Sequence, residues 1–166
     1  MSGAMAGNGS AEVEKSLKTV RIVCGAMVAA VLLYAAVSWY LARSGAVAPV
    51  DAGTANLLKQ AFVAVMLIGV LGWMVIWGRA RVPTPSTVAR PEVELRRGPG
   101  GMVTRLIAAY AFLEAVGLVG ATVHLLTGSV GVLATAVAVV VLGAALSYPR
   151  EEWFQRFLDS RNLVNR

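Results

Sequence analysis

Four long apolar runs, separated by short polar segments, set the pattern of this chain. They cover residues 20–41, 57–77, 104–127 and 130–148. A helix rises by about 1.5 Å per residue, so each run is long enough to cross the hydrocarbon core of a bilayer. The pattern predicts an all-α polytopic membrane protein. We expect four transmembrane helices in two hairpins, forming a single membrane domain over residues 20–148.

The first apolar run follows a polar N-terminal segment, residues 1–19. Its first ten residues are small and polar, and we predict them to be disordered. From Ala11 onward apolar residues recur at helical spacing, which predicts a short amphipathic lead-in to the first span. The sequence Ala46-Val47-Ala48 resembles a signal-peptide cleavage site. However, the run is longer than a signal peptide requires and Pro49 would follow the cut, so we interpret it as a retained anchor.

Two further polar segments lie around the second pair of runs. Residues 78–101 contain four prolines and end in a glycine-rich stretch, which predicts a linker with extended character. After Pro149 the tail, residues 149–166, shows an amphipathic helical pattern in which Trp153 and Phe154 share the apolar face. Such a helix lies flat on the membrane surface or packs on the linker, and the pattern leaves both alternatives open.

Basic residues lie on one side of the four-span arrangement. The chain has 15 Lys and Arg against 9 Asp and Glu, and all the basic residues except Arg43 and Lys59 fall on the side of the termini and the linker. The positive-inside rule therefore predicts a bacterial cytoplasmic (inner) membrane protein with both termini in the cytoplasm. These arginines are spread over three segments without aromatic interleaving, which argues against nucleic-acid binding.

Aromatic residues near the ends of the apolar segments are typical of the membrane interface. The residues that we assign to this interface are Trp39, Tyr40, Trp73, Trp77, Trp153 and Phe154.

Glu114 is the only acidic residue within the four runs, and it lies near the middle of the third. A charged carboxylate at that depth costs about 3 kcal/mol, so we expect it to be protonated, paired or turned toward protein. Ala111, Gly117 and Ala121 are small residues that we place on the same helical face, where they allow another helix to approach closely. Tyr110 lies one turn before the acid, and its hydroxyl can reach the carboxyl group.

Other chemistry-bearing residues are few. Cys24 is the only cysteine, and we interpret it as a small buried hydrophobe. His124 is the only histidine. It lies ~15 Å along the helix from Glu114 and is rotated by about 80°, so the two cannot pair directly. We interpret His124 as an interface residue near the outer headgroups rather than as a ligand or proton relay. We therefore expect no enzyme activity, no metal site and no cofactor.

The segment Glu114-Ala115-Val116-Gly117-Leu118-Val119-Gly120 resembles the membrane-carboxylate helix of subunit c, the proteolipid of rotary ATP synthases. That helix reads Glu-Ala, then an aliphatic residue, then Gly six positions after the acid. The resemblance implies that Glu114 is a protonatable site exposed alternately to a pore and to lipid. The chain departs from the family in its second run, which offers only Gly69 and Gly72 where subunit c has a glycine-rich helix, and in its long linker.

Two weaker relationships accompany this resemblance. Aligning Arg21 with Arg105 indicates an internal repeat of two hairpins, with Ala30 at the position of Glu114. The chain is also similar to small four-span bacterial membrane proteins that share a Glu-bearing helix, a similarity that assigns no activity.

Two functions remain open from the sequence. In the first, the protein is a structural or accessory subunit that packs into a homo-oligomer or a larger membrane assembly through Ala111, Gly117 and Ala121. In the second, Glu114 with Tyr110 binds a proton or cation during proteolipid-like translocation. The expected partners are the lipid bilayer and further copies or other membrane subunits.

Overall fold

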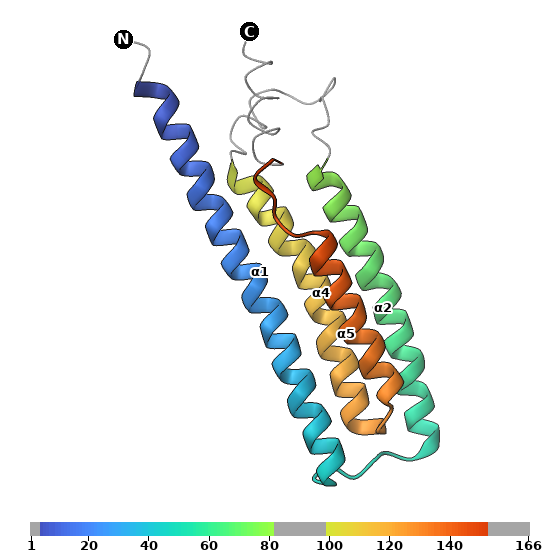
Figure 1. Ribbon diagram of the computed structural model, residues 1–166. Coiled ribbons are helices and arrows are strands. Elements are labelled where there is room, and N and C mark those ends of the chain that lie inside the picture. Colours follow the sequence, from blue (N-terminus) through green and yellow to red (C-terminus); the bar gives the residue numbers. More distant parts are fainter. Residues whose placement is uncertain (1–3, 82–98, 153–166) are drawn as a thin grey trace.

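The computed structural model describes the backbone of residues 4–81 and 99–152, and the side chains of residues 14–78 and 103–152. This part of the chain is all-helical, as predicted, with helices α1 (Ala4–Ser44), α2 (Ala52–Arg81), α4 (Pro99–Thr127) and α5 (Val130–Leu146). Successive helices run in opposite directions and form one elongated bundle (Figure 1). Residues 82–98 of the predicted linker and 153–166 of the predicted amphipathic tail, including Trp153 and Phe154, lie outside the described residues.

Three of these helices are long and apolar enough to cross a membrane, over Glu14–Ser44, Ala52–Gly78 and Val103–Thr127. This agrees with the prediction of transmembrane helices. α5 is apolar throughout but has only 17 residues, at the lower end of the range for a span. It ends at Leu146, before the predicted limit at 148, because Pro149 has no N–H and disfavours a helical conformation in the residue that precedes it.

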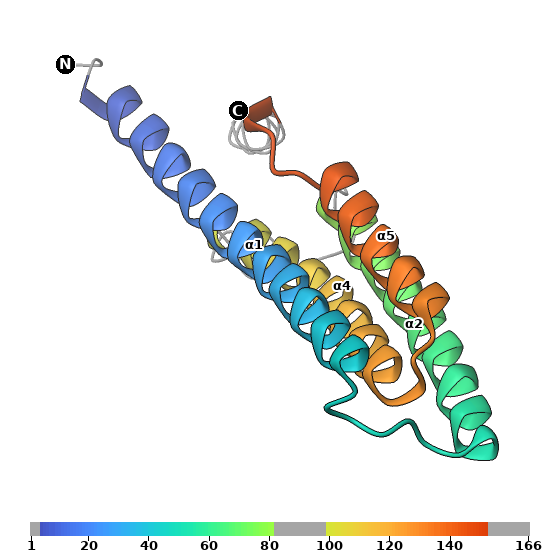
Figure 2. The ribbon, with the colours of Figure 1, turned by 60° about the horizontal axis from the view of Figure 1, so that its bottom comes forward.

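Three helices, α1, α2 and α4, begin earlier than the predicted apolar runs. α1 begins at Ala4, so residues 4–10, which we predicted to be disordered, are helical. Once a helix is nucleated, each further residue adds a backbone hydrogen bond at little cost, and the apolar span supplies that nucleus. The first turns of α1 extend beyond the ends of the other helices (Figure 2).

Asp51 determines where α2 begins. Its carboxylate accepts hydrogen bonds from the backbone N–H of Thr54, at 3.0 Å, and from the Thr54 hydroxyl, while its carbonyl accepts the N–H of Ala55. This is an N-cap, which satisfies donors that the first turn leaves without partners. The Thr54 hydroxyl and then its backbone N–H hold the pKa of Asp51 below its ordinary value.

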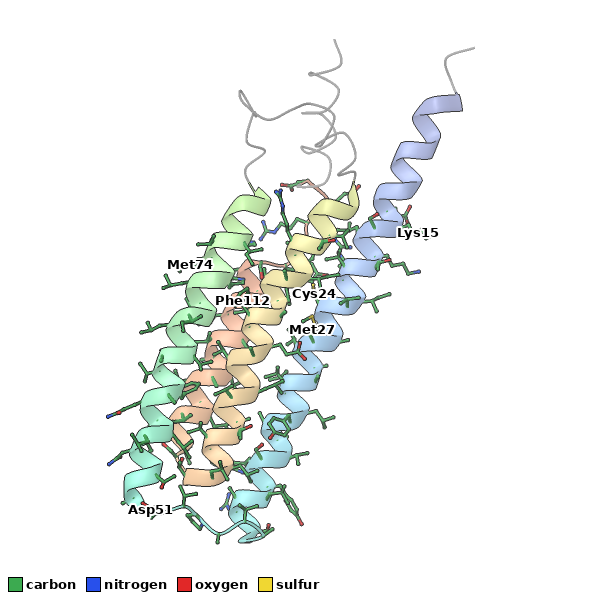
Figure 3. All side chains as sticks on the ribbon, turned by 180° about the vertical axis from the view of Figure 1, so that it is seen from behind. Lys15, Cys24, Met27, Asp51, Met74 and Phe112 are labelled. Atoms are coloured by element: carbon green, nitrogen blue, oxygen red, sulfur yellow. The ribbon has the colours of Figure 1, made fainter. Side chains whose placement is uncertain are left out.

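α4 is the central helix, because it packs on α1, α2 and α5. Seen from behind, it lies in front of α5, with α2 and α1 on either side (Figure 3). α4 and α5 form a packed hairpin whose turn contains Gly128, at a φ of 67° that favours glycine. α1 and α2 have almost no contact with one another. They pack separately on α4 rather than as a hairpin on each other.

Glycines provide the close approaches that hold the three helices on α4. A Cβ atom added at any of five glycines would collide with a neighbouring helix, and small residues are what allow such approaches between membrane helices. The contacts are Gly69 with Val116, Gly72 with Phe112, Gly117 with Val31 and Val140, Gly120 with Ala136 and Phe62, and Gly143 with Leu113. Gly69 and Gly72, although few for a proteolipid, are therefore the positions at which α2 meets the carboxylate helix.

α1 and α4 run in the same direction and meet along a seam of side chains. We call this the α1–α4 seam; it joins the cluster of Val20, Cys24, Leu106 and Tyr110 at one end to Ala35 and Ala121 further along. In the repeat alignment Ala30 of α1 is the counterpart of Glu114 of α4. Ala30 is exposed, and the residues of α1 that line a recess together with Glu114 are Met27, Val28 and Val31.

Candidate functional site

Glu114 lies in the middle of the span Val103–Thr127, on the side of α4 that faces α1. Its side chain is half-buried. Together with Tyr110 and five apolar residues it lines a shallow recess that has no room for a water molecule. The apolar residues of this recess are Met27, Val28, Val31, Leu113 and Val140.

The Glu114 carboxyl group has no hydrogen bond or ion pair in the part of the chain that the structure describes. The contact that we predicted with Tyr110 is not formed, since the tyrosine hydroxyl donates to the carbonyl of Ala144 on α5, at 3.0 Å. The reason is that Ala144 lies in the last turn of α5, where carbonyls lack an intrahelical donor. A buried hydroxyl beside such a carbonyl satisfies both groups.

The three small residues that we assigned to one packing face do not form a single outward surface. Gly117 and Ala121 are buried inside the chain, against α1 and α5, whereas Ala111 is exposed. Six residues at 100° each place Ala111 and Gly117 about 120° apart around the helix, which explains why they face different surroundings. Gly117 and Ala121 are therefore occupied by contacts within the chain.

A different row of small residues lies on the side of α4 that no other described helix covers. Thr104, Ala108, Ala111 and Ala115 recur at the spacing of one helical face, and all but the partly buried Ala108 are exposed. We call this row the open face of α4. It lies between α1 and α2 (Figure 3). Glu114 stands at its edge, about 60° around the helix from Ala111. The sequence signal for this face is the helical spacing of its small residues.

His124 is buried, contrary to our placement of it among the outer headgroups. It is 2% exposed, and its ring stacks on Trp39 of α1, with ring centroids 5.7 Å apart and an interplanar angle of 16°. Next to it along the seam, the Tyr34 hydroxyl donates to Thr122 Oγ1, at 3.1 Å, since Thr122 itself donates to the Leu118 carbonyl. Thr122 and His124 of α4 therefore both contact α1.

The predicted interface aromatics divide into two groups. Trp39 and Tyr40 are exposed at the end of α1, although Trp39 also covers His124. Trp73 is only 5% exposed and faces α4 and α5 rather than the surroundings. Its indole N–H donates to Ser147 Oγ, at 3.4 Å, and its ring stacks on Trp77 at 5.1 Å. The correction for Trp73 has a simple cause: it follows Gly69 by one turn and so lies on the same packed face of α2.

Arg21 of α1 contacts the residues that follow the end of α5. Its Nε donates to the Pro149 carbonyl, at 3.2 Å, and its guanidinium lies over the Tyr148 ring, 5.5 Å from the centroid. Cys24, one turn along, is buried against its neighbours in the α1–α4 seam. Among the described residues no group of three His, Cys, Asp or Glu side chains lies together in a way that could hold a metal ion.

Comparison with known proteins supplies no relative for this chain. No protein-family model matches it, no curated protein matches it, and no solved structure matches its fold.

Proposed function

We propose that this chain is a non-enzymatic integral membrane subunit that assembles with further copies or with other membrane proteins through the open face of α4. One observation carries the proposal: Glu114, in the middle of a membrane span and at the edge of that face, has no polar partner in the described chain. An acid at this depth is costly unless it is protonated or meets a polar group. A helix packed on the open face brings such a group to it.

The composition of the open face supports helix association. In lipid there is no hydrophobic drive for helices to associate, so they pack where small side chains let the backbones approach and where polar groups meet. Ala108, Ala111 and Ala115 permit this approach, and Glu114 supplies a hydrogen-bonding group. Within the chain, the same kind of contact holds α1 at Gly117 and α2 at Gly69.

For the topology, we propose four spans in a bacterial cytoplasmic membrane, with both termini in the cytoplasm. The alternating helix directions support it, because Lys15, Lys18 and Arg21 lie at the same end of the bundle as Arg105 and Arg150. Arg43 and Lys59 belong to the opposite end. An excess of Lys and Arg at one end is the pattern that orients membrane proteins.

Proteolipid-like translocation of a proton or cation through Glu114 is the second candidate. The observation in its favour is that Glu114 is only half-buried and lies in the middle of a span, where the resemblance to subunit c implies a protonatable site. It ranks second because Tyr110, its proposed companion, is bonded to Ala144, and the recess at Glu114 is otherwise apolar. Translocation then requires a path supplied by a partner.

Substitutions at two positions test these functions. Ala115→Leu fills the open face and is expected to weaken assembly in lipid by about 1–3 kcal/mol, as overpacking does. Ala30→Leu, at an exposed alanine on α1, is the matched control and is expected to leave assembly unchanged. Native mass measurement or crosslinking in nanodiscs gives the readout. Equal assembly in both variants contradicts the open face as an interface.

Two substitutions at Glu114 distinguish assembly from translocation. Glu114→Leu removes the hydrogen bond and is expected to weaken assembly by about 0.6–2 kcal/mol. Glu114→Gln keeps a hydrogen-bonding group that cannot ionise, so under the assembly function it is expected to be nearly silent. If Glu114→Gln assembles normally but abolishes ion flux in proteoliposomes, translocation replaces assembly as the function of this residue.

A further inference from the structure

Arg21 of α1 is held in a fixed position beside the residues that follow α5. Its Nε donates to the Pro149 carbonyl at 3.2 Å, and its guanidinium lies 5.5 Å from the centroid of the Tyr148 ring. These contacts use one of the five N–H bonds of the guanidinium and one of its flat faces. The edge formed by the two Nη atoms has no hydrogen-bond partner among the described residues. Such an edge matches two oxygens of a phosphate group.

The depth of Arg21 along the bundle is that of phospholipid headgroups. Residues 22–42 of α1 contain no charged side chain, and they rise by about 30 Å, the thickness of the hydrocarbon core. α5 contains no charged side chain either, and Arg150 is the first charged residue after it. Because Arg21 binds the Pro149 carbonyl, these two elements reach the edge of the hydrocarbon core at the same level. Lipid phosphates lie at this level.

Two further cations lie close to Arg21 in the chain. Lys18 lies about one helical turn before it on α1, at a spacing that places both on one side of the helix, and Arg150 directly follows Pro149. Both side chains are exposed, and neither forms an ion pair among the described residues. Phosphate groups are bound where several such cations come together.

Carboxylates at this end of the bundle are fewer than cations. Glu14 lies seven residues before Arg21, ~10 Å further from the bilayer along α1. The other two carboxylates, of Glu151 and Glu152, follow Arg150 in the chain. The described cations at this end are Lys15, Lys18, Arg21, Arg105 and Arg150. The described residues therefore leave this end with an excess of positive charge.

We propose that Arg21, Lys18 and Arg150 bind the headgroup phosphate of an anionic phospholipid. The Nη edge of Arg21 pairs with two phosphate oxygens, and Lys18 and Arg150 add positive charge around them. This charge selects an anionic lipid, because a zwitterionic lipid brings an ammonium group that the same cations repel. The acyl chains lie on the exposed apolar surface that continues toward the bilayer centre, which includes Ile22 of α1 and Leu146 of α5.

A lipid at this site connects two elements that have few direct contacts. α1 and α5 both pack mainly on α4 and much less on one another. A phosphate bound by Lys18 and Arg21 on one side and by Arg150 on the other joins α1 to the residues after α5. The site requires only that the chain lies in a bilayer, so it depends neither on assembly through the open face of α4 nor on the function of Glu114.

Lipid binding to the full chain in detergent tests the site. The protein is titrated separately with dioleoyl phosphatidylglycerol and dioleoyl phosphatidylcholine, which differ only in the headgroup, and native mass spectrometry gives the Kd of the first bound lipid. We expect phosphatidylglycerol to bind at least about tenfold more tightly, because each Lys or Arg near a membrane surface strengthens the binding of anionic lipid about fivefold. Arg21→Gln and Lys18→Gln are each expected to reduce this preference about fivefold.

Arg43→Gln is the matched control, because it removes one exposed positive charge from the opposite end of the same helix; its preference is expected to equal that of the wild-type protein. Three results overturn the site: equal binding of the two lipids by the wild-type protein, an equal loss of preference in Arg43→Gln and Arg21→Gln, or an unchanged preference in both Arg21→Gln and Lys18→Gln. The first is measured without any variant. Lys18→Gln breaks no ion pair among the described residues, so it decides the matter even where Arg21→Gln disturbs the fold.

Discussion

The two helices that flank α4 are held on it by different chemistry. On one side, α2 meets α4 through Gly69 and Gly72, which receive the apolar side chains of Val116 and Phe112. On the other side, the α1–α4 seam contains an equally close approach at Gly117, but it also carries several polar groups. Those groups are Glu114, Tyr34, Thr122, Ser38 and His124.

This difference indicates that the α2 side and the α1 side of α4 have different roles. Interdigitated apolar contacts have one good arrangement and resist change, because each loses its dispersion contacts when the helices separate. Polar groups whose hydrogen-bonding capacity is not fully satisfied gain free energy by binding a proton, water or another protein. We therefore expect α2 and α4 to form the rigid part of the bundle, and the α1–α4 seam to be where the molecule responds.

Overpacking the α2 contact is expected to have the largest effect. Gly69→Leu places a branched side chain where Val116 and the Phe112 carbonyl already lie, so the helices must separate. We expect a loss of about 1–3 kcal/mol of unfolding free energy in bicelles, measured by steric trapping. Gly25→Leu is the control, since a Cβ at that helical glycine meets open space. An equal loss of unfolding free energy in Gly25→Leu and Gly69→Leu would contradict the conclusion that the α2–α4 contact is the rigid one.

Substitutions of two tyrosines are expected to have effects of intermediate size on the unfolding free energy. Tyr110→Phe leaves the Ala144 carbonyl at the end of α5 without its donor, whereas Tyr34→Phe leaves Thr122 still bonded to Leu118. Hydrogen bonds between membrane helices contribute about 0.6 kcal/mol on average and up to ~1.7 kcal/mol. We expect the loss of unfolding free energy to lie at the upper end of this range for Tyr110→Phe and at the lower end for Tyr34→Phe, measured by the same unfolding assay. The reverse order would show that bare carbonyls matter less than seam contacts.

Asp51 is expected to show the smallest effect, because its carboxylate lies outside both packed sides and is fully exposed. Hydrogen bonds from Thr54 lower its pKa in the folded chain, so its ionised form stabilises the start of α2. That stabilisation is present above the ordinary pKa of an aspartate and is lost as the pH falls through the lowered value. Asp51→Asn keeps a good N-cap and removes the titration.

For this substitution, the measurement is thermal unfolding in detergent as a function of acid pH. The wild-type protein is expected to lose slightly more stability than Asp51→Asn as the solution is acidified. Identical acid dependence in the two proteins would mean that the cap does not depend on its charge.

Sequence alone determined the properties that depend on local composition and length. Apolar runs long enough to span a bilayer identified the helices, because an unsatisfied backbone in lipid leaves few alternatives to helix. The same reasoning placed Glu114 in the middle of a span, since depth follows from position in the run. The basic residues at one end predict an orientation, which stays a prediction. Each of these inferences needs only the distance along a chain and the character of the residues there.

Tertiary structure alone decided which side of each helix faces which neighbour. A helix that is apolar all round has no polar side to mark its exposed face, so its hydrophobic pattern does not reveal its packed one. That is why the pattern did not reveal that Trp73 lies inward against Ser147. The Tyr110 hydroxyl donates a hydrogen bond to the Ala144 carbonyl rather than to Glu114, because the end of α5 lies beside it. His124 became buried because α1 runs parallel to α4 and brings Trp39 to its level, a contact between residues 85 positions apart that no local pattern encodes.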